Sequence, residues 1–149
     1  MMKITEIYKA VNVRLKTKYD YKTYGQEVVE GYDKPSFFVK LIPKIISNES
    51  VFYKRFAYTI FITYFSDKIG EKKSVDNLQK IDEIQELFGN NLKIKEGTSI
   101  NLFDYSYDFV GNDADILQIS IETVFYDKIP VIDENEIAGE ININNQLKG

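Results

Sequence analysis

Carboxylates are the side chains in this sequence with the greatest capacity for chemistry. Glu27 and Glu30 flank a predicted strand and Glu122 lies in another. These positions suggest the pair of carboxylates that glycosidases use. Such a site needs a deep cleft, whereas a chain of 149 residues rich in strands barely covers its own sheet. A small carboxylate-dependent hydrolase therefore stays an alternative that the pattern supports only weakly.

Four aspartates between residues 104 and 115 suggest a second kind of site, one that binds calcium. They are Asp104, Asp108, Asp113 and Asp115. Their spacing does not match an EF-hand loop, which needs oxygen ligands at fixed odd positions, a glycine and a final glutamate. We interpret them as solvated acids of a strand and its turn, and we expect no metal site.

The sequence contains no histidine and no cysteine. Histidine is the usual general base near neutral pH, and both residues are common metal ligands. Their absence excludes Ser-His-Asp triads, Cys-His dyads, disulfides and cysteine-based zinc or iron–sulfur sites. The glycines are scattered and form no phosphate-binding loop. We therefore predict a protein that is not an enzyme and needs no cofactor.

Charge and hydropathy restrict the partners further. The formal net charge is -4, and no basic block is present that would neutralise nucleic-acid phosphates. No apolar run approaches the roughly 20 residues needed to span a bilayer, and no signal-peptide pattern opens the chain. We expect a soluble protein of the cytoplasm that recognises neither nucleic-acid sequence nor membrane.

Two segments have the periodicity of amphipathic helices. Residues 4–18 place an apolar residue at every third or fourth position, and we expect a second helix from the N-cap Ser74 to a stop at Gly89. Its predicted apolar face is formed by Val75, Leu78, Ile81, Ile84, Leu87 and Phe88.

The other segments predict strands. A short strand covers 22–30, with Gly25 at a bulge or close approach, and a second runs from Ser36 to Ile42, bounded by Pro35 and Pro43. A turn at 44–50 precedes a long strand over 51–65, which has apolar residues on both faces. We therefore expect it to be covered on both sides, or on one side by a neighbouring subunit.

Three further strands are predicted at 92–95, 100–110 and 116–126, the last two joined by a hairpin at Gly111-Asn112-Asp113. In the last strand one face is apolar, comprising Leu117, Ile119, Ile121, Thr123 and Phe125. The fold class is therefore α+β: a mostly antiparallel sheet of about five to six strands with two helices packed on one face. Residues 1–129 form a single domain.

The composition changes after Pro130. Residues 130–149 are polar and acidic with isolated isoleucines, so we expect a C-terminal tail that is flexible or bound to a partner. Ile141 and Ile143 alternate with asparagines, a pattern that could add a strand to the sheet edge of a partner.

One segment resembles a known family. Residues 24–43 read Tyr-Gly-Gln-Glu-Val-Val-Glu-Gly-Tyr-Asp-Lys-Pro-Ser-Phe-Phe-Val-Lys-Leu-Ile-Pro. The Tyr-Gly-x-Glu opening, the Gly and Pro of the turn and the Phe-Phe-Val-Lys-Leu strand resemble the tail terminator family of phages, prophage-like elements and phage-tail-like bacteriocins of Gram-positive bacteria. The layout of residues 4–128 is similar as well.

The resemblance implies a structural, tail-terminator-like virion component that caps the end of a tail tube as a ring, usually a hexamer, and stops tube polymerisation. It implies these partners: further copies of the chain, the tail tube, sheath proteins of a contractile tail, and a head–tail connector or collar. We also predict that the loop from Ile42 to Tyr53, with Lys54 and Arg55 beside it, contacts the tube or an adjacent subunit; an ordinary exposed hairpin loop is the alternative. Phe52, Tyr53, Lys54 and Arg55 are our interface candidates, because aromatics and arginine are enriched at interfaces. A monomeric adaptor of a tail apparatus is the main alternative.

Overall fold

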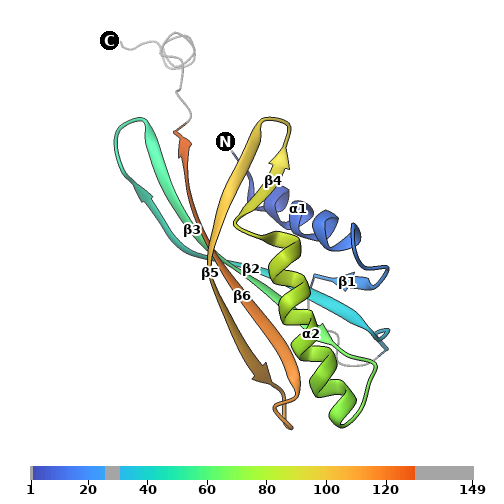
Figure 1. Ribbon diagram of the computed structural model, residues 1–149. Coiled ribbons are helices and arrows are strands. Elements are labelled where there is room, and N and C mark those ends of the chain that lie inside the picture. The colour runs from blue at the N-terminus through green and yellow to red at the C-terminus, as the bar shows by residue number, and fades with distance from the viewer. Residues whose placement is uncertain (1, 26–30, 130–149) are drawn as a thin grey trace, which may run out of the picture.

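The computed structural model describes residues 2–25 and 31–129, in which helix, three strands, helix and three strands follow one another as predicted. The elements are α1 (Ile4–Lys16), β1 (Lys22–Tyr24), β2 (Ser36–Asn48), β3 (Tyr53–Phe65), α2 (Glu71–Phe88), β4 (Asn91–Lys95), β5 (Thr98–Val110) and β6 (Ile116–Lys128). The strands form one sheet in the order β1-β2-β3-β6-β5-β4, in which only the β1–β2 pair is parallel. Figure 1 shows both helices on the same face of this twisted sheet, which confirms the α+β prediction.

The core lies between the two helices and the sheet. α1 contributes the buried stripe that its periodicity predicts: Ile7, Ala10, Val11 and Leu15. The predicted apolar face of β6 is buried at all five positions from Leu117 to Phe125. Burial of these side chains, at about 25 cal/mol per Å² of apolar surface, is the main force that holds the helices on the sheet.

β2 is longer than predicted. The strand does not end at Pro43 but continues to Asn48, and β3 begins at Tyr53 rather than at Val51. The loop is therefore residues 49–52, and only residues 49 and 50 of it belong to the predicted turn at 44–50. Proline is tolerated here because β1 pairs with β2 only over Ser36–Phe38, which leaves no described strand beside Pro43 to receive an N–H. A register shift between Pro43 and Ile45 accommodates the ring.

The start of α2 also differs from the prediction. Ser74 is not the N-cap; the helix begins at Glu71 and its cap is Gly70, which has a φ of 63°. The backbone N–H groups of Lys73 and Ser74 donate to the Gly70 carbonyl, so the first turn is closed one turn earlier than the sequence suggests. The predicted stop at Gly89 is confirmed, since its N–H donates to the carbonyl of Gln85.

The buried face of α2 differs from the prediction as well. Val75 and Leu78 are exposed, whereas Asn77 and Lys80 are buried beside Ile84 and Phe88. The reason is that α2 packs the charged Lys80 side chain against the sheet, and the apolar pattern of the helix gives no sign of this.

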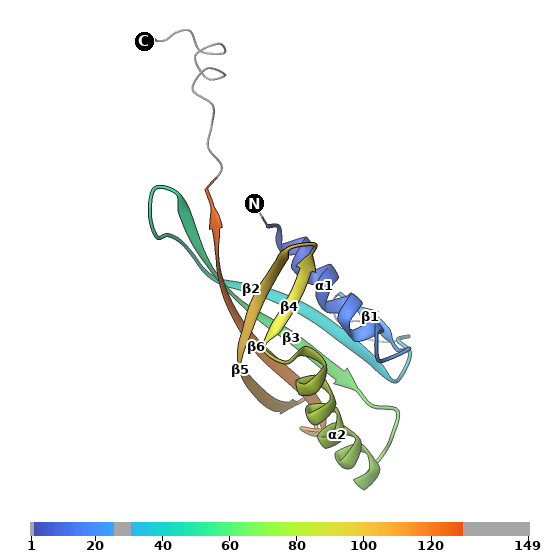
Figure 2. The same ribbon diagram turned by 45° about the horizontal axis from the view of Figure 1, so that its top comes forward.

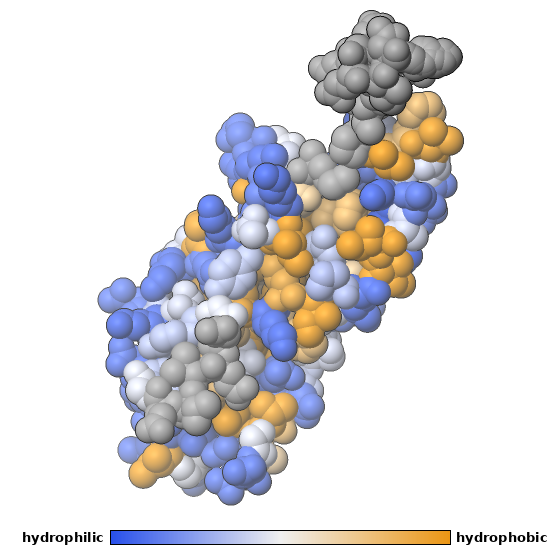
Figure 3. Space-filling model, turned by 180° about the vertical axis from the view of Figure 1, so that it is seen from behind, coloured by the Kyte–Doolittle hydropathy of each residue, from blue (hydrophilic) through white to orange (hydrophobic). Residues whose placement is uncertain are grey.

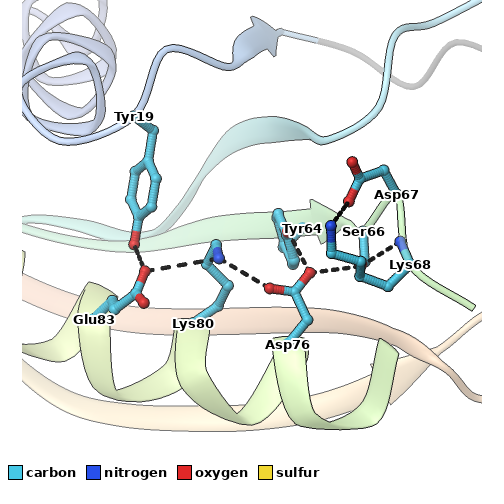
Figure 4. A network of polar contacts seen from close by, with 8 residues as sticks. All are labelled: Tyr19, Tyr64, Ser66, Asp67, Lys68, Asp76, Lys80 and Glu83. Carbon is cyan, nitrogen blue, oxygen red and sulfur yellow. Dashed lines mark hydrogen bonds and ion pairs between the residues drawn. The ribbon is translucent and has the colours of Figure 1, made fainter. Parts of the chain in front are cut away.

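That charged group is part of a buried polar network, shown in Figure 4. The Lys80 side chain is only 7% exposed, and its ammonium nitrogen lies 3.1 Å from Asp76 and 3.7 Å from Glu83. Asp76 also accepts hydrogen bonds from the Tyr64 hydroxyl at 2.6 Å and the Ser66 hydroxyl at 2.5 Å. Because Tyr64 and Ser66 come from the sheet side, the network pins α2 to the end of β3.

Aromatic rings enclose the same ammonium. Its nitrogen lies 4.9 Å from the ring centre of Tyr64, 5.6 Å from that of Tyr19 and 5.8 Å from that of Tyr21. Burial alone would raise the pKa of Asp76, but the hydrogen bonds from Ser66, Tyr64 and Lys80 outweigh it and hold this pKa below its usual value. All charged members of the network therefore have partners, as a buried ion pair requires.

The predicted close approach at Gly25 is confirmed. A Cβ atom built at this glycine would collide with the Tyr8 hydroxyl of α1. The described part of the predicted strand at 22–30 is β1, which ends at Tyr24, and residues 26–30 lie outside the described residues.

The described residues cover the sheet face opposite the helices only in part. β3 lies in the interior of the sheet, as its two apolar faces suggest. On its helix side Tyr58, Ile60, Ile62 and Tyr64 are buried, whereas on the other side Phe61 and Phe65 are half-buried. We call this second face the open face.

Candidate functional site

Three strand ends form a projecting arm. We define the arm as residues 44–57 of the β2–β3 hairpin together with Val124–Lys128 of β6. β3 pairs with β6 as far as Tyr53 and Lys128, whereas the β5–β6 ladder stops at Leu102 and Thr123. The arm is therefore a three-stranded ribbon that extends beyond the layer the helices cover, as Figures 1 and 2 show.

Apolar side chains are concentrated on the arm. Its exposed large hydrophobic residues are Ile45, Ile46, Val51, Phe52, Tyr53 and Tyr126. Phe52, at the loop, is 65% exposed, and Tyr126 is 60% exposed. Single exposed apolar residues are normal, but a cluster on one projecting element is typical of an interaction site.

The loop at the tip has a defined conformation. The Ser50 hydroxyl accepts hydrogen bonds from the backbone N–H groups of Phe52 and Tyr53, at 3.1 and 3.2 Å. The backbone N–H groups of Glu49 and Ser50 donate to the Tyr53 carbonyl. This loop presents Val51 and Phe52 to solvent in a fixed arrangement, which lowers the entropy cost of binding a partner.

The two predicted cations lie on opposite faces of the arm, because side chains alternate along a strand. Arg55 lies on the open face, opposite Tyr126 in the ladder, and its Nε is 4.0 Å from Glu49. Lys54 lies on the helix-side face, opposite Asp127, which accepts a hydrogen bond from the backbone of Met2. The arm thus offers a cation beside an aromatic ring on its open face.

An aromatic cluster anchors the base of the arm. The rings of Phe56 and Phe125 stack with centres 5.1 Å apart, and Tyr58 packs edge-on against Phe125 at 5.5 Å. Aromatic pairs of this kind add about 0.5–1.5 kcal/mol beyond their buried area. The base is therefore rigid enough to hold the exposed tip in place.

The open face contains a hollow of about 460 Å³. Its lining is largely apolar and includes Phe38, Phe61, Phe65, Val110 and Ile116. Figure 3, seen from behind, shows hydrophobic side chains in a band over the sheet and again at the projecting end. One chain thus carries two distinct apolar surfaces, the arm and the open face.

Two of the carboxylates considered for chemistry, Glu122 and Asp115, bind neighbouring side chains. Glu122 accepts hydrogen bonds from the Thr59 hydroxyl at 3.0 and 3.1 Å and pairs with Lys44 at 3.2 Å. Asp115 pairs with Lys73 at 2.9 Å, which lowers the pKa of its carboxyl group. Within residues 2–25 and 31–129 no acidic cluster could hold a metal ion. Glu27 and Glu30 lie outside the described residues.

The predicted interface residues are brought together in part. Phe52, Tyr53, Lys54 and Arg55 all lie on the arm, whereas Ile141 and Ile143 fall outside the described residues. Sequence reasoning includes Ile45 and Ile46 in the predicted contact loop without naming them as interface candidates, and it misses Tyr126. It places Ile45 and Ile46 in a turn and Tyr126 at the end of an ordinary strand. Continued alternation beyond Pro43 is the signal that could place the two isoleucines on a strand.

Neither described helix has an apolar stretch long enough to cross a membrane. The sequence matches the family described as phage tail terminator protein over residues 6–136. Several solved structures resemble the fold; one of them has a TM-score of 0.51 and 16% sequence identity, and the match covers 89% of this chain and 100% of the other. No curated protein matches the sequence. The chain therefore belongs to the phage tail terminator family, whose members are structural proteins of tail assembly.

Proposed function

We propose that this protein caps the finished end of a phage or phage-like tail tube as a homo-oligomeric ring, a hexamer in our proposal, and thereby terminates tube polymerisation. The outer side of the ring offers the surface for a head connector or collar. Family membership supports the role in tail assembly, and the two apolar surfaces of the chain support the ring.

The projecting arm is the observation on which this proposal depends most. A closed ring uses heterologous contacts, in which two different surfaces of each subunit meet. The arm provides one surface that is exposed, apolar and positioned by a rigid base. The open face, with its hollow beside Phe61 and Phe65, provides a second surface that a neighbouring subunit could cover.

The remaining assignments follow from this arrangement. Phe52, Tyr53, Lys54 and Arg55 contact either the tube or the adjacent subunit. Residues 130–149 bind a partner of the tail, with Ile141 and Ile143 adding a strand to its sheet. In our proposal, assembly takes place in the bacterial cytoplasm and the protein then remains in the particle, whether this is a phage or a headless contractile bacteriocin with a sheath.

Tail length tests the capping role. Tails from cells that lack this protein should have variable and excessive lengths in negative-stain images, and the wild-type gene should restore uniform length. We expect Phe52→Asp to fail in this restoration, because a charge on the tip of the arm opposes burial at an apolar contact.

Ile69→Asp is the matched control, because Ile69 is also a large apolar residue, 81% exposed, but lies in the segment before α2 and not on the arm. The proposal predicts uniform tails with this variant. Uniform capped tails with Phe52→Asp would refute the role of the arm. Particles that contain isolated copies of the chain would favour the monomeric adaptor instead of the ring.

A further inference from the structure

A third surface, distinct from the arm and the open face, is rich in positive charge. α1 and β4 border a cleft of about 540 Å³. Its lining contains four cations and one carboxylate: Lys9, Arg14, Lys93, Lys95 and Glu6. The chain as a whole has a net charge of -4, so this local excess of positive charge runs against the general trend of the protein.

Two of the four cations, Lys93 and Lys95, form ion pairs that are only weak. Lys95 pairs with Glu6 at 3.3 Å and Lys93 with Glu96 at 3.5 Å, and both lysines are more than half exposed. Exposed ion pairs of this kind contribute little to the stability of the fold, so either lysine can readily pair with another carboxylate instead. The cleft therefore retains the capacity to bind an acidic segment.

The floor of the cleft is apolar. Val13 is 65% exposed there, between Ala10 and the half-buried Ile94. A ligand that combines carboxylates with separated aliphatic side chains would match both features of the cleft, its charge and its floor.

The C-terminal segment of this chain has that composition. Between residues 130 and 143 it contains four carboxylates, no cation and several isoleucines. The carboxylates are Asp133, Glu134, Glu136 and Glu140, and isoleucines lie at 132, 137, 141 and 143.

The last described strand comes close to the N-terminal end of α1, the helix that forms one border of the cleft. Asp127 of β6 accepts a hydrogen bond from the backbone of Met2, immediately before α1, and the Ile129 N–H donates to the Phe52 carbonyl at 2.7 Å. Residues 130–141 can span up to about 40 Å when extended. Val13 lies about 16 Å along the helix from Met2, since each helical residue adds 1.5 Å. Ile141 can therefore reach Val13 of its own chain.

We propose that, in the free protein, the acidic segment 130–143 binds in the α1–β4 cleft of the same chain, with its carboxylates against the lysines and an isoleucine over Val13. The consequence for assembly rests on the proposed function: the bound segment keeps Ile141 and Ile143 from pairing with a partner until the tail displaces it. The docking itself is independent of the ring.

Disulfide trapping tests the proposal. Because the sequence has no native cysteine, any disulfide bond must join introduced cysteines. Purified full-length Val13→Cys/Ile141→Cys is oxidised at low protein concentration and analysed on a non-reducing gel. The control is Ile69→Cys/Ile141→Cys, because Ile69 is exposed but separated from β4 by the 18 residues of α2, about 27 Å. We expect an intramolecular bond that forms at least about fivefold faster in the Val13 pair, because docking raises the effective concentration.

Charge variants test the electrostatic part. In the Val13 pair, Lys9→Glu should slow trapping, whereas Lys72→Glu, a change of an exposed lysine on α2, should not. Trapping should also slow when salt shortens the Debye length from about 10 Å at 0.1 M to about 3 Å at 1 M.

Three results would overturn the proposal: equal trapping rates in the two pairs, insensitivity to Lys9→Glu, or bonds only between different molecules. The last would show that the cleft receives the segment of another copy. Since trapping uses the free protein and tail length reports on the particle, a failure of one does not imply a failure of the other.

Discussion

The buried network of α2 gives a prediction whose size follows from the structure. Asp76→Asn removes the charge that faces the Lys80 ammonium at 3.1 Å, while the amide oxygen can still accept from Tyr64 or Ser66. The main effect is therefore a buried cation that has lost its closest counter-charge.

Breaking a buried ion pair by removing one partner typically costs 3–5 kcal/mol. We expect a loss of about 3 kcal/mol here, at the low end, because Glu83 at 3.7 Å and the ring of Tyr64 still stabilise the ammonium. A domain of this size has a free energy of unfolding of about 5–15 kcal/mol, so the loss is a substantial fraction of it.

Urea denaturation followed by circular dichroism, at one protein concentration, measures this loss. Asp67→Asn is the control, since its pair with Lys68 at 3.3 Å is exposed and should contribute less than about 1 kcal/mol. Adding Lys80→Met to Asp76→Asn removes the stranded charge and should recover part of the stability. A loss as small as that of the control, or no recovery in the double variant, would refute the reasoning.

Three further predictions concern the same fold and its arm. Gly25→Ala should destabilise the protein by about 1–3 kcal/mol in thermal or urea unfolding, because the added methyl group meets the Tyr8 hydroxyl, and Tyr8→Phe in the same chain should relieve part of the cost. The pKa of Asp76 is lowered in the folded state, so this carboxylate stabilises the fold above the ordinary carboxyl pKa of about 3.9, and the stabilisation is lost as pH falls below that value. The difference in unfolding free energy between wild type and Asp76→Asn should therefore shrink at low pH. A constant difference down to about pH 2 would contradict this. Arg55→Glu should change the free energy of unfolding by less than about 0.5 kcal/mol yet impair capping of tails in negative-stain images, whereas Lys72→Glu should leave both unchanged; uniform capped tails with Arg55→Glu would exclude the contact.

Most elements are visible in the sequence because their signals are local. The alternation from Leu117 to Phe125 predicts which side of β6 is buried, and the spacing of Ile7, Val11 and Leu15 predicts the stripe of α1. A side chain's position on a strand or helix follows from backbone geometry, so a regular apolar pattern is sufficient. The lack of histidine and cysteine likewise limits the chemistry open to the chain, because composition alone decides which reactive groups are present.

The errors arise where a distant element decides the outcome. Pro43 does not end β2 because β1 stops at Tyr24 and leaves that edge of the sheet without a described partner. Lys80 is buried and Leu78 exposed because Tyr64 and Ser66 at the end of β3, with Asp76 on α2, form a polar site for the ammonium. Hydropathy assigns the inner face of a helix by polarity alone and cannot anticipate such partners.

The sequence by itself thus determined the family, the fold class and the order of the elements, since these depend on local periodicity and on the segment 24–43. Only the tertiary structure decided which surfaces are available for binding. The arm forms because β6 continues to pair with the β2–β3 hairpin beyond the last residue pair of the β5–β6 ladder. The α1–β4 cleft forms because α1 lies beside β4, which is distant in sequence. Both surfaces result from contacts between segments that are distant in sequence, and such contacts produce no periodic pattern from which they could be predicted.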